Sequence, residues 1–580
     1  MGQYAILQIT AFVLVVLLLV KPLGAYMACV FEQRSCRFDR LLAPSERLIY
    51  KICSIDASRE MNWKEYLVAV CAFILIAFLS LLLILLTQSS LPLNPQKLPN
   101  VPFLAALNIA LSFVTNTDWM PYPGEITLTY FTQLAGISVH NFISAGMGMA
   151  VLLALIRGFT RKETETLGNF WVDLVRAILY ILLPLAVIWA LILMSQGVID
   201  NVKPYVVAHV LDGSNSVSTQ TLPMGPVASQ EAIKDLGSNG GGFFNTNSAH
   251  PFENPTPLSN FFEMLGLVLI PAALCYMFGQ MVRDVRQGWA LLTAMTLIFI
   301  VAALLLTFVE QQGNPMLQSL PVNTNVVADG IIQSPGGNME GKELRFGIDD
   351  SALFTVATTA SSNGSVNSML DAYTPIGGMI PMFLIQLGEV VYGGVGSGLY
   401  SMLMLVLITV FIAGLMVGRS PQYLGKKIEP FEMKMAALVV LLIPVLVLLP
   451  TALAVLNKST LAALGNPGAH GFSEFLYAFS SMANNNGSSF AGLKGDTNFF
   501  NILGGIVMLL GRLGIIISVL AVAGSLATKK TVPVSLGTLP THTGFFVGML
   551  IFVMVILAGL TFIPALALGP ITEELQMYHI

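Results

Sequence analysis

The chain has 580 residues, of which 55% are hydrophobic and only 10% are charged, and its mean hydropathy is +0.75. Soluble domains carry about 25% charged residues, so this composition excludes a soluble globular protein, a disordered chain and a fibrous one. The formal net charge of −4 and the lack of a long basic run exclude nucleic acid as an expected partner. The sequence therefore predicts an all-α membrane protein that crosses the bilayer many times.

A helix needs about 20 mostly apolar residues to cross a bilayer. Ten stretches of the chain meet this requirement. They are 4–20, 65–88, 126–156, 172–196, 258–282, 288–309, 372–418, 435–456, 500–527 and 543–569. Basic residues between spans favour the cytoplasmic side of the membrane, and 20 of the 28 Lys and Arg residues lie in five alternate connections. These connections are Lys21–Lys64, Arg157–Arg176, Arg283–Arg286, Arg419–Lys434 and Lys529–Lys530.

The stretch 372–418 is long enough for two crossings, but two crossings would place the basic residues after Arg419 outside. One crossing keeps all five basic connections inside, so we expect ten spans with both termini external. We expect 372–418 to be one interrupted helix, because it contains Gly393, Gly394, Gly396 and Gly398. Irregular backbone at membrane depth is tolerated only where it is buried in protein or lines a cavity.

Four external segments carry the same short polar signature near their C-terminal ends. Each signature has a hydroxyl or amide residue, then Asn, then Gly or Thr. They read Thr115-Asn116-Thr117-Asp118, Ser238-Asn239-Gly240-Gly241, Ser362-Asn363-Gly364-Ser365 and Asn485-Asn486-Gly487-Ser488. Asn and Gly are common in ordinary turns, and for any single segment a turn is the simpler interpretation. The recurrence at the same place in the topology favours a shared function instead.

The signatures divide the chain into four span–loop–span units that all run from inside to outside and back. The units are 65–156, 172–282, 288–418 and 435–527, with an N-terminal span and cytoplasmic loop in 1–64 and a C-terminal span and external tail in 543–580. Parallel repeats are related by an axis along the membrane normal. We therefore predict four pore-loop repeats in a pseudo-fourfold arrangement, like that of a potassium channel, with two flanking helices.

In a potassium filter, backbone carbonyl groups replace the hydration shell of the ion. Glycine suits this task because it adopts positive φ without a steric penalty from Cβ. Only Asp118 is acidic among the signatures, so carbonyl coordination of a monovalent cation fits better than a Ca²⁺ or Mg²⁺ cage. We predict that the third residues, Thr117, Gly240, Gly364 and Gly487, form the tightest ring.

Glu263, Glu389 and Arg512 are charged residues within predicted spans, and we expect partners for Glu389 and Arg512, because intramembrane charges usually pair or line a cavity. Arg512 is about 25 Å of helix away from Lys529 at 1.5 Å per residue, which is too far to reach the inner surface. Glu389 lies beside the glycine interruption that includes Gly394 and Gly396. We expect Arg512 to lie just below the filter, where it opposes free passage of the cation, with Glu389 holding it. The alternative is a purely structural ion pair.

Long stretches of the chain resemble the potassium-binding A subunits of the bacterial Kdp potassium-transporting ATPases. The matching stretches are Met61–Lys64, GSNGGGFFNTNSAHPFENPTP at 237–257, GEVVYGGVGSGLY at 388–400, GRSPQYLGKKIE at 418–429 and NNNGSSFAGL at 484–493. Two positions depart from that pattern, because Asp118 stands where Asn is usual and Met120 where Gln is usual. The segment around His250 and Glu253 is expected to brace the second loop and to start the next helix at Pro257.

The resemblance implies a protein of the bacterial cytoplasmic membrane that captures extracellular K⁺, the transported ion, and passes it through a protein tunnel to the B subunit, a P-type ATPase. It also implies a C subunit, a small single-span F subunit and a lipid environment. The chain has no DKTGT motif, and its phosphate-loop match at 336–343 has Glu343 where Ser or Thr is required, so we expect no ATP hydrolysis by the chain itself. The alternative is a self-sufficient channel or symporter of the related Trk/Ktr type, which shares the fourfold repeat. The two flanking spans and the long motif matches argue against it.

Overall fold

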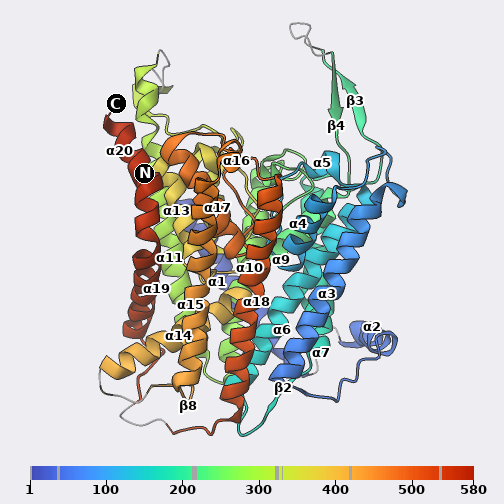
Figure 1. Cartoon of the computed structure of the whole chain (residues 1–580), viewed down its shortest axis with the longest axis vertical. Helices are drawn as coiled ribbons and strands as arrows, with labels where there is room; N and C mark the ends of the chain where they lie inside the picture. The colour runs from blue at the N-terminus through green and yellow to red at the C-terminus, as the bar shows by residue number, and fades with distance from the viewer. Residues whose placement is uncertain are drawn as a thin grey trace.

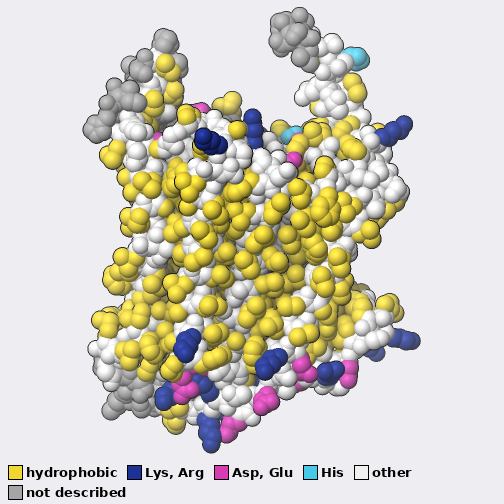
Figure 2. Space-filling model, in the orientation of Figure 1, with side chains coloured by type: hydrophobic (Ala, Val, Ile, Leu, Met, Phe, Trp, Pro, Cys, Tyr) yellow, Lys and Arg dark blue, Asp and Glu magenta, His cyan; other side chains and the backbone are white. Residues whose placement is uncertain are grey.

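The computed structural model describes residues 3–34, 39–211, 218–320, 325–328, 331–416, 418, 421–533 and 538–579. Within these residues, ten helical segments are long and apolar enough to cross a membrane, as the sequence predicts. They form a bundle whose long axis is vertical in Figure 1. Figure 2 shows hydrophobic side chains over the middle of the visible face and charged side chains toward the two ends. The chain is therefore a multi-pass membrane protein.

The spanning helices agree with the predicted stretches, with shifts at their ends. Their bounds are α1 (Gln3–Phe31), α3 (Trp63–Thr87), α6 (Val139–Thr160), α7 (Phe170–Arg176) with α8 (Leu183–Ser195), α10 (Pro257–Met281), α11 (Val285–Gln312), α14 (Ser397–Met416), α15 (Pro430–Leu456), α18 (Asn498–Thr528) and α19 (Gly544–Leu566). One large shift is in α1, which continues through Pro22 to Phe31 instead of ending near residue 20. This extension packs closely on α10, because a Cβ at Gly24 would lie only 2.6 Å from the carbonyl oxygen of Ala273.

The spanning helices fall into an inner and an outer set. The most apolar stretches of the segments that contain α6, α10, α14 and α18 are 83, 89, 78 and 67% buried. The corresponding values are 33, 50, 50 and 39% for the segments of α3, α7–α8, α11 and α15, and 28% for α1. In each predicted unit, the second span is therefore an inner helix and the first span lies outside it, facing the bilayer.

The stretch 372–418 is broken into α13 (Pro375–Gln386) and α14, with non-helical backbone between them. Gly396 has a φ of +86°, and a Cβ at this residue would collide with the carbonyl oxygen of Gly148 in α6. The break is buried against an inner helix, which is where irregular backbone is tolerated in a membrane protein. The interruption lies at the predicted glycines, whereas residue 417 and Arg419 lie outside the described residues.

Each connection that leads from an outer helix to an inner helix within one unit contains a shorter helix that the sequence analysis missed. These helices are α4 (Phe103–Val114), α9 (Val227–Gly237), α12 (Gly347–Ala360) and α17 (Gly468–Ala483). At 11–16 residues they are too short to span a bilayer. Three of them also contain charged residues, so their sequences are typical of soluble segments and not of spans.

The remaining elements cover the two ends of the bundle. At the end that carries the four shorter helices lie the hairpins β3 (Val206–His209) with β4 (Thr219–Leu222) and β5 (Asn325–Ala328) with β6 (Ile331–Pro335), and the short helices α5 (Gly124–Thr127), α16 (Lys458–Leu461) and α20 (Thr572–His579). At the other end lie α2 (Asp39–Ile52), β1 (Met61–Asn62) paired with β2 (Thr166–Gly168), and β7 (Gln422–Tyr423) paired with β8 (Lys426–Lys427). Figure 1 shows the β3–β4 hairpin projecting from the first of these ends.

Local sequence signals set where key helices begin. The Asn62 side chain accepts hydrogen bonds from the amides of Lys64 and Glu65, and Glu65 returns a bond to the Asn62 amide, which forms a capping box at the start of α3. Thr256 caps α10, which begins at Pro257 as predicted.

Candidate ion-binding site

The four signatures follow directly on the C-terminal ends of α4, α9, α12 and α17. We name them loop 1 (Thr115–Asp118), loop 2 (Ser238–Gly241), loop 3 (Ser362–Ser365) and loop 4 (Asn485–Ser488). The C-terminal end of a helix carries a partial negative charge and unsatisfied carbonyl groups. Four such ends directed at one set of loops create an environment that favours a cation.

The four loops share one backbone geometry. In each, an amide donates to the carbonyl five residues earlier: Thr117 to Ser112 at 3.0 Å, and Asn239 to Lys234, Asn363 to Thr358 and Asn486 to Ser481, each at 2.9 Å. The preceding residue has positive φ in each loop, at 61° for Asn116, 51° for Ser238, 55° for Ser362 and 52° for Asn485. These two features match Thr117 to the asparagines Asn239, Asn363 and Asn486.

This match corrects the predicted register of loop 1 by one residue. The pattern of hydroxyl, Asn and then Gly or Thr aligned Thr117 with the glycines, whereas the backbone aligns Asp118 with Gly240, Gly364 and Gly487. The error arose because Thr115-Asn116 and Ser238-Asn239 have the same residue types. The positive φ that distinguishes Asn116 from Thr115 is a backbone property that residue types do not reveal.

Hydrogen bonds join the four loops into a closed ring. The bonds run from Asn116 Nδ2 to the Ser238 carbonyl (3.0 Å), from Ser238 Oγ to the Ser361 carbonyl (2.6 Å), from Ser362 Oγ to the Asn484 carbonyl (3.0 Å) and from Asn485 Nδ2 to Thr117 Oγ1 (2.7 Å). Each loop thus donates to the next loop in chain order or, for loops 3 and 4, to the residue directly before it, and the fourth donates to the first. The structure brings all four signatures together at one place.

The third residues of loops 2 to 4 meet at close range. A Cβ on Gly240 would lie 2.9 Å from the Cα of Gly364, and a Cβ on Gly364 would lie 2.8 Å from the carbonyl carbon of Gly487. A Cβ on Gly487 would collide with the carbonyl oxygen of Thr117. Any side chain at these three glycines would therefore displace backbone of a neighbouring loop. We call Thr117, Asp118, Gly240, Gly364 and Gly487 the loop ring.

The remaining signature residues lie behind this contact. Ser365 Oγ is 2.8 Å from Ser248 Oγ, and Ser488 Oγ is 2.8 Å from Tyr477 Oη. Gly241 has a φ of +70°, so it takes a conformation that side chains other than glycine rarely adopt. These residues hold the loops in shape.

Asp118 places a fully buried carboxylate in the loop ring. Its Oδ2 accepts hydrogen bonds from Asn239 Nδ2 at 2.8 Å and from the Gly240 amide at 3.1 Å, which ties loop 1 to loop 2. Its Oδ1 has no hydrogen-bond partner among the described residues. Burial raises the pKa of the Asp118 carboxyl well above its usual value, and the bonds from Asn239 and Gly240 act in the opposite direction.

Arg512 of α18 lies at the start of loop 1. Its Nε donates to the carbonyl of Thr115 at 2.6 Å, and its Nη1 donates to Tyr400 Oη at 3.3 Å. Nη1 also lies 3.8 Å from Glu389 Oε2, and both side chains are buried. The structure therefore brings the predicted partners Arg512 and Glu389 together beside loop 1. The sequence analysis missed Tyr400, an uncharged residue in an apolar helix that gave no signal of its own.

The segment after loop 2 packs behind it as expected. The Phe244 ring stacks on His250 with centroids 3.6 Å apart, and the Phe244 amide donates to Glu253 Oε1 at 2.8 Å. Burial and the neighbouring Arg345 lower the pKa of His250 to about 4. A neutral, stacked His250 and a hydrogen-bonded Glu253 brace the loop.

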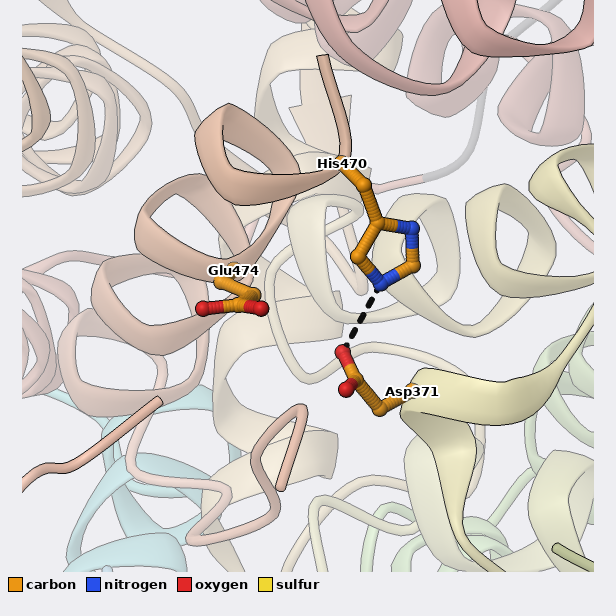
Figure 3. Close-up of side chains that lie close together, drawn as sticks. All are labelled: Asp371, His470 and Glu474. Carbon is orange, nitrogen blue, oxygen red and sulfur yellow. Dashed lines mark hydrogen bonds and ion pairs between the residues drawn. The ribbon is translucent and has the colours of Figure 1, made fainter. Parts of the chain in front are cut away.

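A second polar cluster lies at the end of the bundle that carries the four shorter helices, near the start of α17. His470 Nε2 lies 2.9 Å from Asp371 Oδ1, and His470 Nδ1 lies 2.7 Å from Glu573 Oε1 of α20. Figure 3 shows His470 directed at Asp371, with Glu474 beside them. Glu474 accepts from the amides of Gly465 and Asn466. Burial alone would lower the pKa of His470, but its two carboxylate partners raise it to about 10. The imidazolium therefore ties the C-terminal helix to α17.

The inner and outer helices and the four loops that meet at their centre define a multi-pass membrane transport protein. The family model described as "Potassium-transporting ATPase A subunit" matches residues 10–575, and the chain belongs to this family. Two relatives carry the name potassium-transporting ATPase potassium-binding subunit. The protein of Herpetosiphon aurantiacus is 56% identical over 99% of both chains, and that of Sorangium cellulosum is 56% identical over 98% of this chain and 99% of its own.

The fold is also similar to that of a solved transporter. The crystal structure of the potassium transporter TrkH from Vibrio parahaemolyticus aligns with a TM-score of 0.52, over 89% of this chain and 97% of that one. The sequence identity is only 14%, so the likeness concerns the fold alone.

Proposed function

We propose that this chain binds and selects extracellular K⁺ at the loop ring and delivers it to a partner P-type ATPase for ATP-driven uptake. The observation that carries the proposal is the closed ring of hydrogen bonds between the four loops, at the ends of four short helices. The relatives named as potassium-binding subunits support K⁺ as the ion. On this proposal the four span–loop–span units are repeats around one pseudo-fourfold axis.

The chemistry of the ring suits a weakly hydrated monovalent cation. Because three positions of the ring are glycines, no side chains lie there, and the backbone carbonyl groups are the polar groups that these positions offer an ion. Rings of carbonyl groups can replace the hydration shell of K⁺. The signature side chains hold neighbouring backbone groups in place, as the bonds of Asn116 and Ser362 illustrate. The negative helix ends lower the free energy of a cation there.

Arg512 explains how the loop ring can bind K⁺ without letting the ion pass freely across the membrane. Its guanidinium group is buried beside loop 1 and is only partly balanced by Glu389 at 3.8 Å. A fixed positive charge close to the inner side of a filter repels a departing cation, and the repulsion is strong where water is scarce. The bound ion then leaves by a tunnel to the partner ATPase, and the break at Gly394 and Gly396 takes part in this coupling.

ATP hydrolysis is assigned to the B subunit of the proposed complex, which the C and F subunits complete. Lys342, the lysine of the phosphate-loop match, is 2.7 Å from Glu310 Oε2 and fully buried, so it is engaged in an ion pair instead of facing a nucleotide site. We further propose the bacterial cytoplasmic membrane as the location, with both termini external. Ten spans place both ends of the chain on the same side, and Figure 1 shows N and C toward the end with the β3–β4 hairpin.

The fold likeness to TrkH favours one other candidate, a self-sufficient channel or symporter. The two candidates differ in whether K⁺ movement needs the ATPase partner. The shared fold cannot separate them, whereas a transport assay can.

The test is the K⁺ dependence of ATPase activity in the purified assembly, with wild type compared with Gly240→Asp. A carboxylate and a Cβ at this residue have no room beside Gly364, so we expect weaker K⁺ stimulation or loss of discrimination among alkali cations. The matched control is Gly544→Asp, where a Cβ meets nothing within 4 Å. An intact Gly240→Asp assembly with unchanged K⁺ dependence contradicts the proposal. K⁺ currents through the chain alone, without an ATPase partner, establish the channel candidate.

A further inference from the structure

The helices α9 and α10 bury a cluster of carboxylates that the loop ring does not use. Glu231 and Asp235 lie one turn apart on α9, and Glu263 lies in the second turn of α10. All three residues are 0% exposed. One oxygen atom of each lies within 4.8 Å of an oxygen atom of each of the others.

The single ammonium group in this cluster is already engaged. Lys234 Nζ forms an ion pair with Glu231 Oε1 and lies 3.8 Å from Glu253 Oε2. Ser248 Oγ donates a further hydrogen bond to Glu231 Oε1 at 3.2 Å. The one positive charge of Lys234 does not balance both Glu231 and Glu253, so it leaves none for the other two carboxylates.

Asp235 and Glu263 have no hydrogen-bond partner for any of their four side-chain oxygen atoms among the described residues. The nearby guanidinium group of Arg345 is bound to Glu343 at 2.7 Å and to the carbonyl groups of Asn254 and Ala249. A buried carboxylate without a partner is strongly unfavourable. Two of them with oxygen atoms within 4.8 Å of each other require a cation or a proton, and each such group in a native protein needs an explanation.

We propose that Glu231, Asp235 and Glu263 bind a divalent cation of the Mg²⁺ or Ca²⁺ class. The donor set consists of carboxylate oxygens without His or Cys, which suits hard cations and not Zn²⁺ or Cu²⁺. The four carboxylates, when ionised, and the single ammonium group of Lys234 carry a net charge of −3, and a divalent ion offsets more of this charge than a monovalent ion does. Metal–oxygen distances of about 2.0–2.6 Å allow two ligands of one ion to lie up to about 5 Å apart, and the observed spacing satisfies this limit.

The position of the site gives the ion a structural role in the filter. The Ser238 amide, at the start of loop 2, donates to the backbone carbonyl of Asp235 at 3.1 Å. On α10, a Cβ at Gly266 would lie 2.9 Å from the Cβ of Asp235, so the two helices pack at close range here. An ion held by Asp235 and Glu263 cross-links the helix that carries loop 2 to an inner spanning helix. This site is separate from K⁺ binding and does not depend on the proposed transport function.

The experiment measures bound metal in the chain purified with the subunits that co-purify with it, by elemental mass spectrometry. We expect about one Mg²⁺ or Ca²⁺ per chain in wild type, as for a buried all-oxygen site, and its loss in the double variant Asp235→Asn/Glu263→Gln. The control Glu340→Gln removes an exposed carboxylate on the same side of the membrane and should keep the ion. The thermal unfolding temperature of wild type should fall after prolonged treatment with a chelator, whereas that of the double variant should not.

The metal content of the wild-type protein tests the proposal even if the double variant does not fold. Absence of a stoichiometric divalent ion from wild type overturns the proposal and leaves shared protons as the neutralising groups. An equal metal content in a folded double variant overturns it as well, because the ion is then bound elsewhere. If exchangeable Rb⁺ occupies this site instead of a divalent ion, the proposed divalent charge of the bound cation is wrong.

Discussion

Loop 1 and the other three loops reach the same backbone geometry with different side chains. Loops 2 to 4 place Gly240, Gly364 and Gly487 at the ring, where no Cβ fits beside the neighbouring backbone. Loop 1 places Asp118 at the equivalent position, with a φ of 56°. Gly487 also has a positive φ, at 97°, whereas Gly240 and Gly364 do not. Hydrogen bonds from Asn239 and Gly240 to the Asp118 carboxylate hold this residue against loop 2.

This difference shows which side chains the positions of the ring can accommodate. Three positions need the absence of a side chain, and the fourth tolerates a carboxylate whose hydrogen bonds reach the next loop. Loop 1 is also the loop that Arg512 contacts, through the Thr115 carbonyl. The buried carboxyl group in the ring and the contact with the guanidinium group of Arg512 therefore both involve loop 1. We expect loops 2 to 4 to set the geometry of the site and loop 1 to set its electrostatics.

The largest effect is expected where the geometry is tightest, in Gly364→Ala. The added Cβ would lie 2.8–2.9 Å from backbone atoms of Gly240, Asn486 and Gly487. Overpacking of this kind costs about 1–3 kcal/mol, which corresponds to roughly 5–150-fold in K⁺ affinity. K⁺ titration of ATPase activity measures it, with Gly548→Ala as the control, because a Cβ there meets nothing within 4 Å. Equal K⁺ affinities for the two variants would show that the close packing of loop 3 at Gly364 does not affect K⁺ binding.

A second large effect is expected from Arg512→Gln, which removes the charge next to loop 1. The assembly should form, but passive Rb⁺ efflux from proteoliposomes without ATP should rise by roughly tenfold, as expected for about 1.4 kcal/mol less repulsion. Arg512→Lys keeps the charge and should keep the leak low. Tyr400→Phe removes only the 3.3 Å hydrogen bond and is expected to change little. If Arg512→Gln transports with unchanged coupling, the residue forms a structural ion pair and nothing more.

A smaller effect is expected from Asp118→Asn, which makes the electrostatics of loop 1 resemble those of the glycine loops. The amide oxygen can still accept from Asn239 and Gly240, so the geometry should persist while the negative charge is lost. We expect K⁺ affinity to fall by up to about tenfold, or about 1.4 kcal/mol. Because burial raises the pKa of the Asp118 carboxyl, wild-type K⁺ affinity should weaken as the medium is acidified, whereas that of the variant should stay constant. A pH profile shared by both proteins would contradict the electrostatic role of loop 1.

The smallest effect concerns the support of loop 4 through α17. The pKa of His470 is raised from 6.5 to about 10, so its charged form stabilises the folded state fully below about pH 6.5. This contribution is lost as the pH rises toward 10. The unfolding temperature of wild type should therefore decline over this interval by more than that of His470→Gln. Parallel declines would show that the bridge from Asp371 to Glu573 adds no stability.

The sequence predicted the spans and the break near Gly394 because composition, length and the distribution of basic residues constrain them directly. It also predicted that the four signatures act together and that Arg512 pairs with Glu389, since few intramembrane partners were available. It missed the short helices: α9 carries Glu231, Lys234 and Asp235, whose burial depends on tertiary contacts. It misplaced the register of loop 1 by one residue, because Thr115 and Asn116 are equally suitable residue types for the first position.

The central claim is that the loop ring binds K⁺, and anomalous scattering from thallium or rubidium ions that replace K⁺ tests it most directly. We expect the strongest anomalous peak within the ring, between the carbonyl groups of Gly240, Gly364 and Gly487 and that of the equivalent residue Asp118. The peak should disappear in Gly240→Asp. A strongest peak elsewhere, with none in the ring of the wild-type protein, would contradict the account.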